Sequence, residues 1–127
     1  MEDTKRNSIL IVDDENSNIL VLTHILSPEY TVYAAKNGEN AIKAAEKHLP
    51  DLILLDIIMP EMDGYAVIRA LKESEVTQHI PIIFITGLHQ ATNVQKGLDL
   101  GAVDYISKPF DHEVVKLRVK IQLESSE

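Results

Sequence analysis

Residues 52–64 read LILLDIIMPEMDG, in which an apolar run ends at a carboxylate, Asp56, and a proline and a glycine follow. A short apolar run without alternation is typical of a strand that is covered on both faces, as in a parallel sheet. Proline and glycine close behind such a run mark a turn. The stretch therefore predicts a buried strand that presents Asp56 at its carboxyl end.

Further short apolar runs on either side of this stretch alternate with helical patterns. We expect strands at Ser8–Val12, Tyr30–Ala35, Leu52–Leu55, Ile82–Thr86 and Asp104–Ser107. We expect helices at residues 16–27, 38–48, 64–73, about 90–100 and 111–123. Residues 90–100 are the weakest helix, because threonine, asparagine and glycine form helices poorly. The alternation predicts an α/β fold, a doubly wound, flavodoxin-like (βα)5 domain whose five-stranded parallel sheet has the order 2-1-3-4-5.

Length and composition narrow the class of protein. The 127 residues suffice for one domain with a core, so we expect residues 1–127 to form a single domain. The net charge of -8 disfavours direct binding of nucleic acid, which needs clustered cations. No apolar run reaches the length of a membrane span, and the chain has no cysteine for disulfides or thiolate metal sites. We expect a cytoplasmic protein that contacts neither membrane nor nucleic acid.

Polar side chains stand at the carboxyl ends of the predicted strands. Asp13 and Asp14 follow the first strand, Asp56 follows the third, Thr86 ends the fourth, and Lys108 follows the fifth. Ligands of doubly wound sheets bind beyond these strand ends, so we expect the side chains to converge. Neighbouring carboxylates that are partly desolvated either raise their pKa values or hold a cation, and an oxygen-only set suits Mg²⁺. A nucleophilic carboxylate, a divalent cation and fixed donors are what phosphoryl transfer requires.

The loop after the first strand, DDENSN, argues against a nucleotide or flavin at that position. It has no glycine-rich cradle of backbone N–H groups, on which such phosphates usually lie. Carboxylates in the same loop would repel a phosphate unless a metal ion intervened.

Four motifs, ILIVDDE, LILLDIIMPEMDG, PIIFITG and GAVDYISKPF, resemble in order and spacing the receiver domain of two-component response regulators. The resemblance covers about residues 7–123. It implies a regulatory phosphoacceptor domain in which Asp56 receives a phosphoryl group from a sensor histidine kinase or phosphotransfer protein and then slowly loses it. It also implies Mg²⁺ held by Asp14, Asp56 and the main-chain carbonyl of Ile58, with Asp13 acting through water.

The same resemblance assigns the remaining site residues. Thr86 and Lys108 would contact the phosphoryl oxygens, and Tyr105 would turn inward when Thr86 moves. The weak helix at residues 90–100 would then repack, as a two-state switch requires. The Lys108–Pro109 bond would be cis. The output would lie in a covalently linked domain or in a separate partner.

The last predicted helix carries two apolar stripes, where a helix on one side of a sheet needs one. The first consists of Val114, Leu117 and Ile121, and the second of Val115, Val119 and Leu123. One interpretation is a wider packed face. The other is that the second stripe meets a partner, either an effector helix or a second copy, in a homodimer through the last helix and strand.

Structural alternatives exist for several of these residues. Asp13 and Asp14 could cap the first helix, although Asn16 could serve there instead. Asp63 and Gly64 would shape the turn into the third helix, with Gly64 supplying backbone freedom. Two other functions also remain open. A phosphohydrolase with an aspartate nucleophile would usually carry a second aspartate where this chain has Ile58, and a pure interaction module would not need intact Asp56, Thr86 and Lys108.

Overall fold

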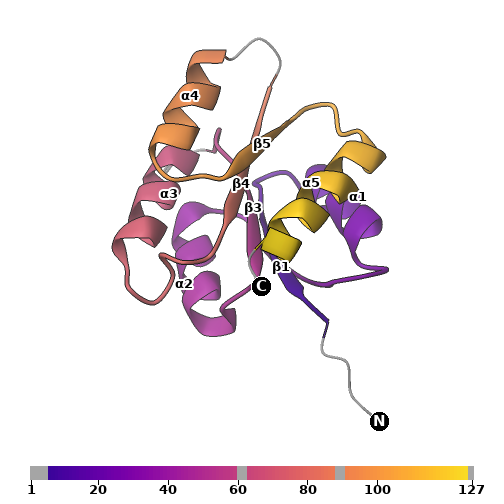
Figure 1. Ribbon diagram of the computed structural model, residues 1–127, viewed down its shortest axis with the longest axis horizontal. Helices are drawn as coiled ribbons and strands as arrows, with labels where there is room; N and C mark the ends of the chain where they lie inside the picture. The colour runs from indigo at the N-terminus through magenta and orange to yellow at the C-terminus, as the bar shows by residue number, and fades with distance from the viewer. Residues whose placement is uncertain (1–5, 60–62, 88–90, 126–127) are drawn as a thin grey trace.

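The computed structural model describes residues 6–59, 63–87 and 91–125, and in it five strands alternate with five helices (Figure 1). The strands are β1 (Ser8–Val12), β2 (Thr31–Ala35), β3 (Leu52–Asp56), β4 (Ile82–Thr86) and β5 (Asp104–Ser107). The helices are α1 (Asn16–Leu26), α2 (Gly38–His48), α3 (Gly64–Glu73), α4 (Ala91–Asp99) and α5 (His112–Ser125). The predicted α/β alternation is confirmed.

The strands form one parallel sheet of order β2-β1-β3-β4-β5, so the predicted flavodoxin-like topology is confirmed. Helices α2, α3 and α4 cover one face of the sheet, while α1 and α5 cover the other (Figure 1). Strand β3 is one residue longer than predicted, because Asp56 still pairs with Ile85 of β4. Asp56 is thus part of the sheet itself and is held by its ladder.

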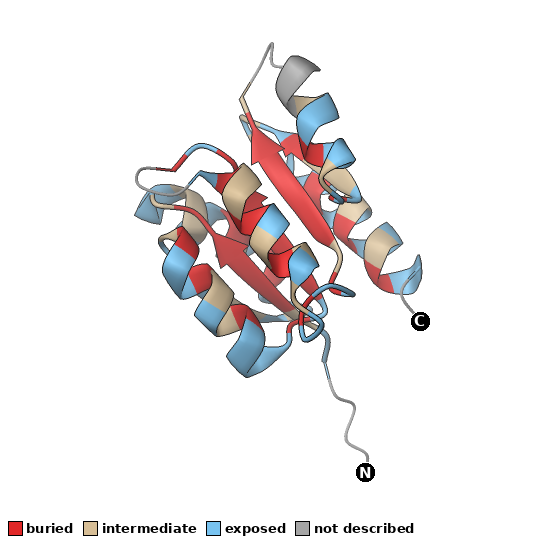
Figure 2. Cartoon of the chain, turned by 90° about the vertical axis from the view of Figure 1, so that its left-hand side faces the viewer, coloured by how far each residue is buried: buried red, intermediate tan, exposed pale blue. Residues whose placement is uncertain are grey.

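The apolar runs of the sequence are explained by burial on both faces of the sheet. Every residue of β3 and β4 is buried, and Figure 2 shows these strands enclosed by helices whose outer faces are exposed. Side chains of one strand alternate between the two cores: Ile53 and Leu55 pack beneath α2 and α3, whereas Leu54 packs beneath α1 and α5. The central strands are therefore rigid supports for what stands at their ends.

The turn into α3 is built differently from the sequence interpretation. Asp63 caps the helix as expected, because its side chain accepts a hydrogen bond of 2.9 Å from the backbone N–H of Ala66. Gly64, however, is needed for space and not for backbone freedom. A Cβ at Gly64 would lie 2.3 Å from the Cα of Ile57 and 2.7 Å from the carbonyl oxygen of Asp56. Helix α3 can therefore approach the end of β3 only through a glycine.

Helix α1 begins without the cap that the sequence suggested. The capping position is Glu15, not Asn16, and within the described part of the chain no side chain makes the capping hydrogen bond there. The interpretation of Asn16 as the cap was wrong, because the chain enters the helix one residue earlier. Asp13 and Asp14 do not cap α1 either, and this leaves their carboxylates available for another role.

Helix α4 forms despite its poor helix formers, and Gly97 explains part of the composition. A Cβ at Gly97 would lie 2.5 Å from Cε1 and 2.7 Å from Cζ of the Phe84 ring. The helix backbone thus lies directly on the aromatic ring of β4. Glycine destabilises a helix, but at this position it allows the close packing of α4 on Phe84.

The two stripes of α5 have opposite environments. Val115 and Val119 are fully buried against the sheet and Leu123 is nearly so, whereas Leu117 and Ile121 are 57% and 48% exposed. The interpretation that the second stripe meets a partner was therefore wrong: that stripe faces the core. The first stripe, Val114, Leu117 and Ile121, is the one that remains available to a partner.

Two further expectations concern the backbone and the membrane. The Lys108–Pro109 peptide bond is cis, as the resemblance implied. Among the described residues, no helix combines the length and the apolar character that crossing a membrane would need.

Candidate functional site

The predicted site residues converge at the carboxyl edge of the sheet. Asp13 follows β1, Asp56 ends β3, Thr86 ends β4, and Lys108 follows β5. The register places the ends of neighbouring strands side by side, since Val12 pairs with Leu55, Asp56 with Ile85 and Thr86 with Ser107. The N–H of Lys108 also donates to the carbonyl of Thr86. The parallel ladder thus brings together residues that are up to 95 positions apart in the printed sequence, from Asp13 to Lys108.

Three carboxylates form the centre of this site. Asp13, Asp14 and Asp56 each offer one oxygen, and these oxygens all lie within 4.8 Å of one another. Asp13 is fully buried, Asp56 is 2% exposed, and Asp14 is half-buried. Like charges at such spacing in a partly desolvated site repel each other, so the cluster fits a hard divalent cation.

Asp13 provides a second, independent sign that a cation fits here. One of its oxygens, Oδ1, accepts a hydrogen bond of 3.0 Å from the backbone N–H of Glu15. The other, Oδ2, is buried and has no hydrogen-bond partner among the described residues. Burial, reinforced by the charge of Asp56, raises the pKa of Asp13 to about 6, although the Glu15 N–H and the Lys108 ammonium oppose this. A buried carboxylate oxygen without a donor is costly unless a cation or an ordered water serves it.

Asp56 is held at both of its oxygens. Oδ1 accepts a hydrogen bond of 3.0 Å from the backbone N–H of Ile58, and Oδ2 lies 3.2 Å from Nζ of Lys108. Lys108 is about one-third exposed, whereas the side chain of Asp56 is almost completely buried. The partly exposed ammonium thus contacts a buried carboxylate, and its role toward a phosphoryl group stays a prediction.

Thr86 and Ile58 have the environments expected of neighbours of this carboxylate. Thr86 is 2% exposed and stands on the strand next to that of Asp56. The backbone N–H of Ile58 faces Asp56, and the side chain of Ile58 is 60% exposed. A backbone role for Ile58 is consistent with this arrangement.

Tyr105 is joined to α5 by a residue that the sequence interpretation missed. The Tyr105 ring is half-buried, 6.1 Å from the Phe84 ring between centroids. The guanidinium carbon of Arg118 lies 5.1 Å from the centre of the same ring, and its Nη1 donates to the Tyr105 carbonyl and lies 3.7 Å from Asp104. Arg118 stands between Lys116 and Lys120 in the sequence, and nothing in that pattern distinguishes it from a solvated cation.

Comparison with known proteins identifies the family to which this fold and site belong. The sequence pattern of the response regulator receiver domain matches residues 9–120. The chain is 42% identical over 113 residues to the response regulator PleD of Caulobacter vibrioides. The matched region covers 88% of this chain and 25% of PleD. The chain is 41% identical over 120 residues to the alkaline phosphatase synthesis transcriptional regulatory protein PhoP of Bacillus subtilis, covering 94% of this chain and 49% of PhoP.

A solved structure agrees with the sequence comparisons. The chemotaxis protein CheY4 of Vibrio cholerae superposes with a TM-score of 0.86 at 28% identity, over 92% of this chain and 98% of that one. The fold and the acidic site define a phosphoacceptor domain of two-component signal transduction. The chain belongs to the response regulator receiver domain family. It spans no more than about half the length of PleD and PhoP, which continue beyond the matched region.

Proposed function

We propose that Asp56 is the phosphoacceptor of this receiver and that a sensor histidine kinase or phosphotransfer protein supplies the phosphoryl group. The observation that carries the proposal is the position of Asp56: it is buried, held between Lys108 and the Ile58 N–H, and has a carboxylate oxygen within 4.8 Å of one from Asp13 and one from Asp14. Asp13 and Asp14 lie next to Asp56, and Lys108 contacts it. Together they supply the charges that phosphoryl transfer to a carboxylate requires.

The reaction follows from these contacts. An oxygen of Asp56 attacks the phosphorus atom while the bond from phosphorus to the imidazole nitrogen of the donor breaks. The Lys108 ammonium then exchanges its contact with Asp56 for one with a phosphoryl oxygen, and the Thr86 hydroxyl donates to another. The Ile58 N–H keeps the attacking carboxylate in one orientation, so little reorganisation is needed during transfer.

Mg²⁺ fits the same site. Asp14, Asp56 and the Ile58 carbonyl would hold it directly, and Asp13 would act through a bound water. When bound, the ion supplies positive charge against which the acceptor carboxylate and the phosphoryl oxygens can approach each other. The three acids repel one another without it, so their own geometry favours its binding.

The switch would run from Thr86 to Tyr105. Movement of the Thr86 hydroxyl toward a new phosphoryl group would leave space beside β4, and the half-buried Tyr105 ring, on the neighbouring strand β5, would enter it. Arg118, on α5, contacts both the ring and the carbonyl of Tyr105, so rotation of the ring would change the contacts between β5 and α5. Slow hydrolysis of the acyl phosphate would reverse the change.

The signal could leave through a homodimer or through a linked output domain. The exposed stripe of α5 and the edge strand β5 are the surfaces that support self-association. Leu117→Glu should weaken self-association in sedimentation measurements. Leu20→Glu is the matched control, since Leu20 is an equally apolar and 68% exposed residue on α1. Equal behaviour of both variants and the wild type would refute the α5 interface.

The acceptor itself is tested by intact-protein mass after incubation with acetyl phosphate, with Mg²⁺ and with chelator, on wild type and Asp56→Asn. One added phosphoryl group that requires Mg²⁺ and disappears in the variant supports the proposal. An adduct that persists in Asp56→Asn would contradict it. If no adduct accumulates, counting released phosphate separates rapid turnover from a module that has lost phosphorylation.

A further inference from the structure

A second cluster of charge lies on the side of the molecule where β2 and α2 meet. A groove of about 400 Å³ runs there, and the following residues line it: Ala34, Ala35, Lys36, Asn40, Lys43, Ala44, Lys47 and His48. Three of these residues are alanines, whose small side chains leave room that larger residues would fill. The volume falls within the range of about 300–1,000 Å³ that is typical of small-molecule sites.

The charge of this groove is opposite to that of the protein. The chain has a net charge of -8, yet three lysines line the groove and no carboxylate among the described residues does. Lys43 and Lys47 are one helical turn apart, so their side chains project from the same face of α2. Glu39 lies 4.0 Å from Lys43, but both side chains are more than 70% exposed, so the pair offers little stabilisation.

An aromatic pair stands where the groove ends. The rings of Tyr33 and His48 are stacked, with centroids 3.9 Å apart and an interplanar angle of 12°. His48 also lines an adjoining depression of about 610 Å³, which Arg6 and Tyr33 share. Asp51 also lines that depression, and its Oδ2 accepts a hydrogen bond of 2.8 Å from the Ser8 N–H. Arg6 and Asp51 offset each other's charge there, and the Arg6 guanidinium donates to the carbonyls of Ser27, Glu29 and Tyr30. The cations open to a ligand beside the stacked pair are therefore the lysines of the β2–α2 groove.

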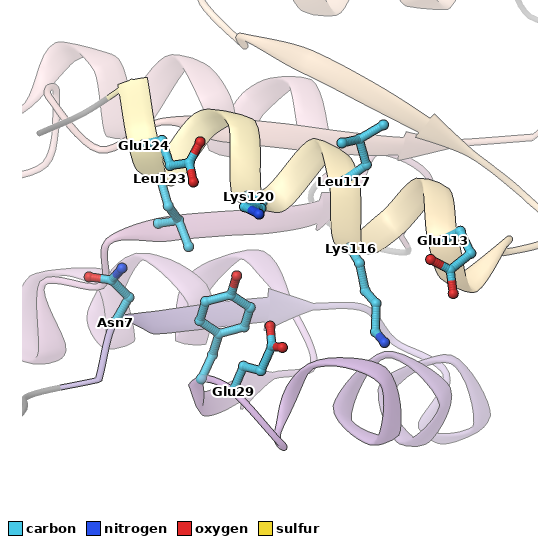
Figure 3. A pocket seen from close by; sticks show the side chains of 9 residues that line it. Asn7, Glu29, Glu113, Lys116, Leu117, Lys120, Leu123 and Glu124 are labelled. Carbon is cyan, nitrogen blue, oxygen red and sulfur yellow. The ribbon is translucent and has the colours of Figure 1, made fainter.

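The groove between α1 and α5 shows that this arrangement is not a general property of the surface. That groove, of about 490 Å³, also contains two lysines one turn apart, Lys116 and Lys120 (Figure 3). Glu29, Glu113 and Glu124 line the same groove and balance their charge. Two grooves of similar size on one acidic protein therefore differ in net charge, and only the β2–α2 groove is suited to an anion.

We propose that the groove between β2 and α2 binds a nucleoside polyphosphate, with the phosphates on Lys36, Lys43 and Lys47 and the base beside Tyr33 and His48. Lysine ammonium groups bind phosphate oxygens as point charges, and stacking on aromatic rings is the usual way to hold a base without reading its edge. The groove begins beside the acidic cluster, because the carbonyl of Ala35 accepts a hydrogen bond from the Asp13 N–H, but none of the three clustered carboxylates lines it. The proposal does not depend on phosphorylation of Asp56.

Calorimetric titration with ATP, in chelator and at low salt, tests the proposal on wild type and two paired variants. Lys43→Gln with Lys47→Gln removes charge from the groove. Lys116→Gln with Lys120→Gln removes the same charge at the same helical spacing from the α1–α5 groove. We expect the first pair to weaken ATP binding by at least about tenfold and the second by less than about twofold. Circular dichroism checks that both pairs fold.

Two further titrations test the nature of the ligand. Pyrophosphate should bind more weakly than ATP. In His48→Ala, the affinity for ATP should fall to nearly that for pyrophosphate. The amide shifts that ATP causes in NMR spectra should centre on Ala34, Ala44 and His48. Equal losses in both lysine pairs, equal affinity for ATP and pyrophosphate, or no binding at millimolar ATP would each overturn the proposal. Preference for an acidic peptide over ATP would also overturn it, in favour of a protein partner.

Discussion

Gly64 packs against the backbone of Asp56 and Ile57, so a change at this glycine should affect both the stability of the fold and the position of the Asp56 carboxylate. Replacing it with alanine adds one methyl group at a position where the new Cβ would lie 2.3 Å from the Cα of Ile57. Ordinary contacts begin at about 3.4 Å, so the two backbones must separate by about 1 Å. The second clash, at 2.7 Å, is with the carbonyl oxygen of Asp56. Both contacts are backbone, so no side chain can rotate away to relieve them.

The expected cost has two parts. Overpacking of this kind destabilises a fold by about 1–3 kcal/mol. In addition, a displacement of about 1 Å at reacting groups can lower a rate by about 100-fold. Gly64→Ala should therefore lose about 1–3 kcal/mol in urea unfolding and lower the initial rate of phosphorylation by acetyl phosphate by far more than its stability would suggest.

Asp63→Ala provides the matched control for this experiment. It removes the cap of α3 in the same turn, which should cost about 1 kcal/mol, but introduces no clash with the end of β3. The rate of phosphorylation should remain near that of the wild type. If Gly64→Ala phosphorylates at the wild-type rate, or if Asp63→Ala slows to the same extent, the contact between Gly64 and the Asp56 backbone does not position the acceptor.

Three further predictions concern charge and the core. Because burial raises the pKa of Asp13 from 3.8 to about 6, the folded state binds more protons than the unfolded state between these values, so stability without Mg²⁺ should fall as pH rises to about 6. The loss should disappear in Asp13→Asn, as urea unfolding at pH 4–8 would show; an unchanged pH profile in the variant would contradict it. Lys108→Ala should slow phosphorylation without abolishing Mg²⁺ binding, measured by titration of the ion against NMR shifts; loss of Mg²⁺ binding would show that the lysine mainly holds the fold. Val119→Glu should unfold the domain, whereas Leu117→Glu should leave thermal unfolding nearly unchanged, because only Val119 is buried; equal melting temperatures would refute this orientation of α5.

Much of the fold could be predicted because the sheet is buried on both faces. Because both faces of the central strands are covered, their sequences are short apolar runs, and the alternation of these runs with helices restricts the topology. The carboxyl ends of those runs then bring Asp13, Asp56, Thr86 and Lys108 together, whichever helices lie between them. These predictions depended on residue type and order alone.

The remaining features depended on distances that a sequence does not contain. Gly64 and Gly97 resemble ordinary turn and helix-breaking glycines, and only the positions of Ile57 and Phe84 reveal that each makes room for a neighbour. The two stripes of α5 are equally apolar, so their sequence could not say which one faces the sheet. The contact of Arg118 with Tyr105 joins two elements whose spacing is fixed by packing.

The central claim is that Asp56, and neither of its acidic neighbours, receives the phosphoryl group. All three carboxylates offer oxygens within 4.8 Å of one another, so proximity alone does not distinguish them. Reduction of the acetyl phosphate-treated protein with borohydride converts an acyl phosphate to an alcohol, which peptide sequencing by mass spectrometry locates. The account predicts that only position 56 is reduced and only when Mg²⁺ was present. Reduction at Asp13 or Asp14, or at Asp56 without Mg²⁺, would contradict it.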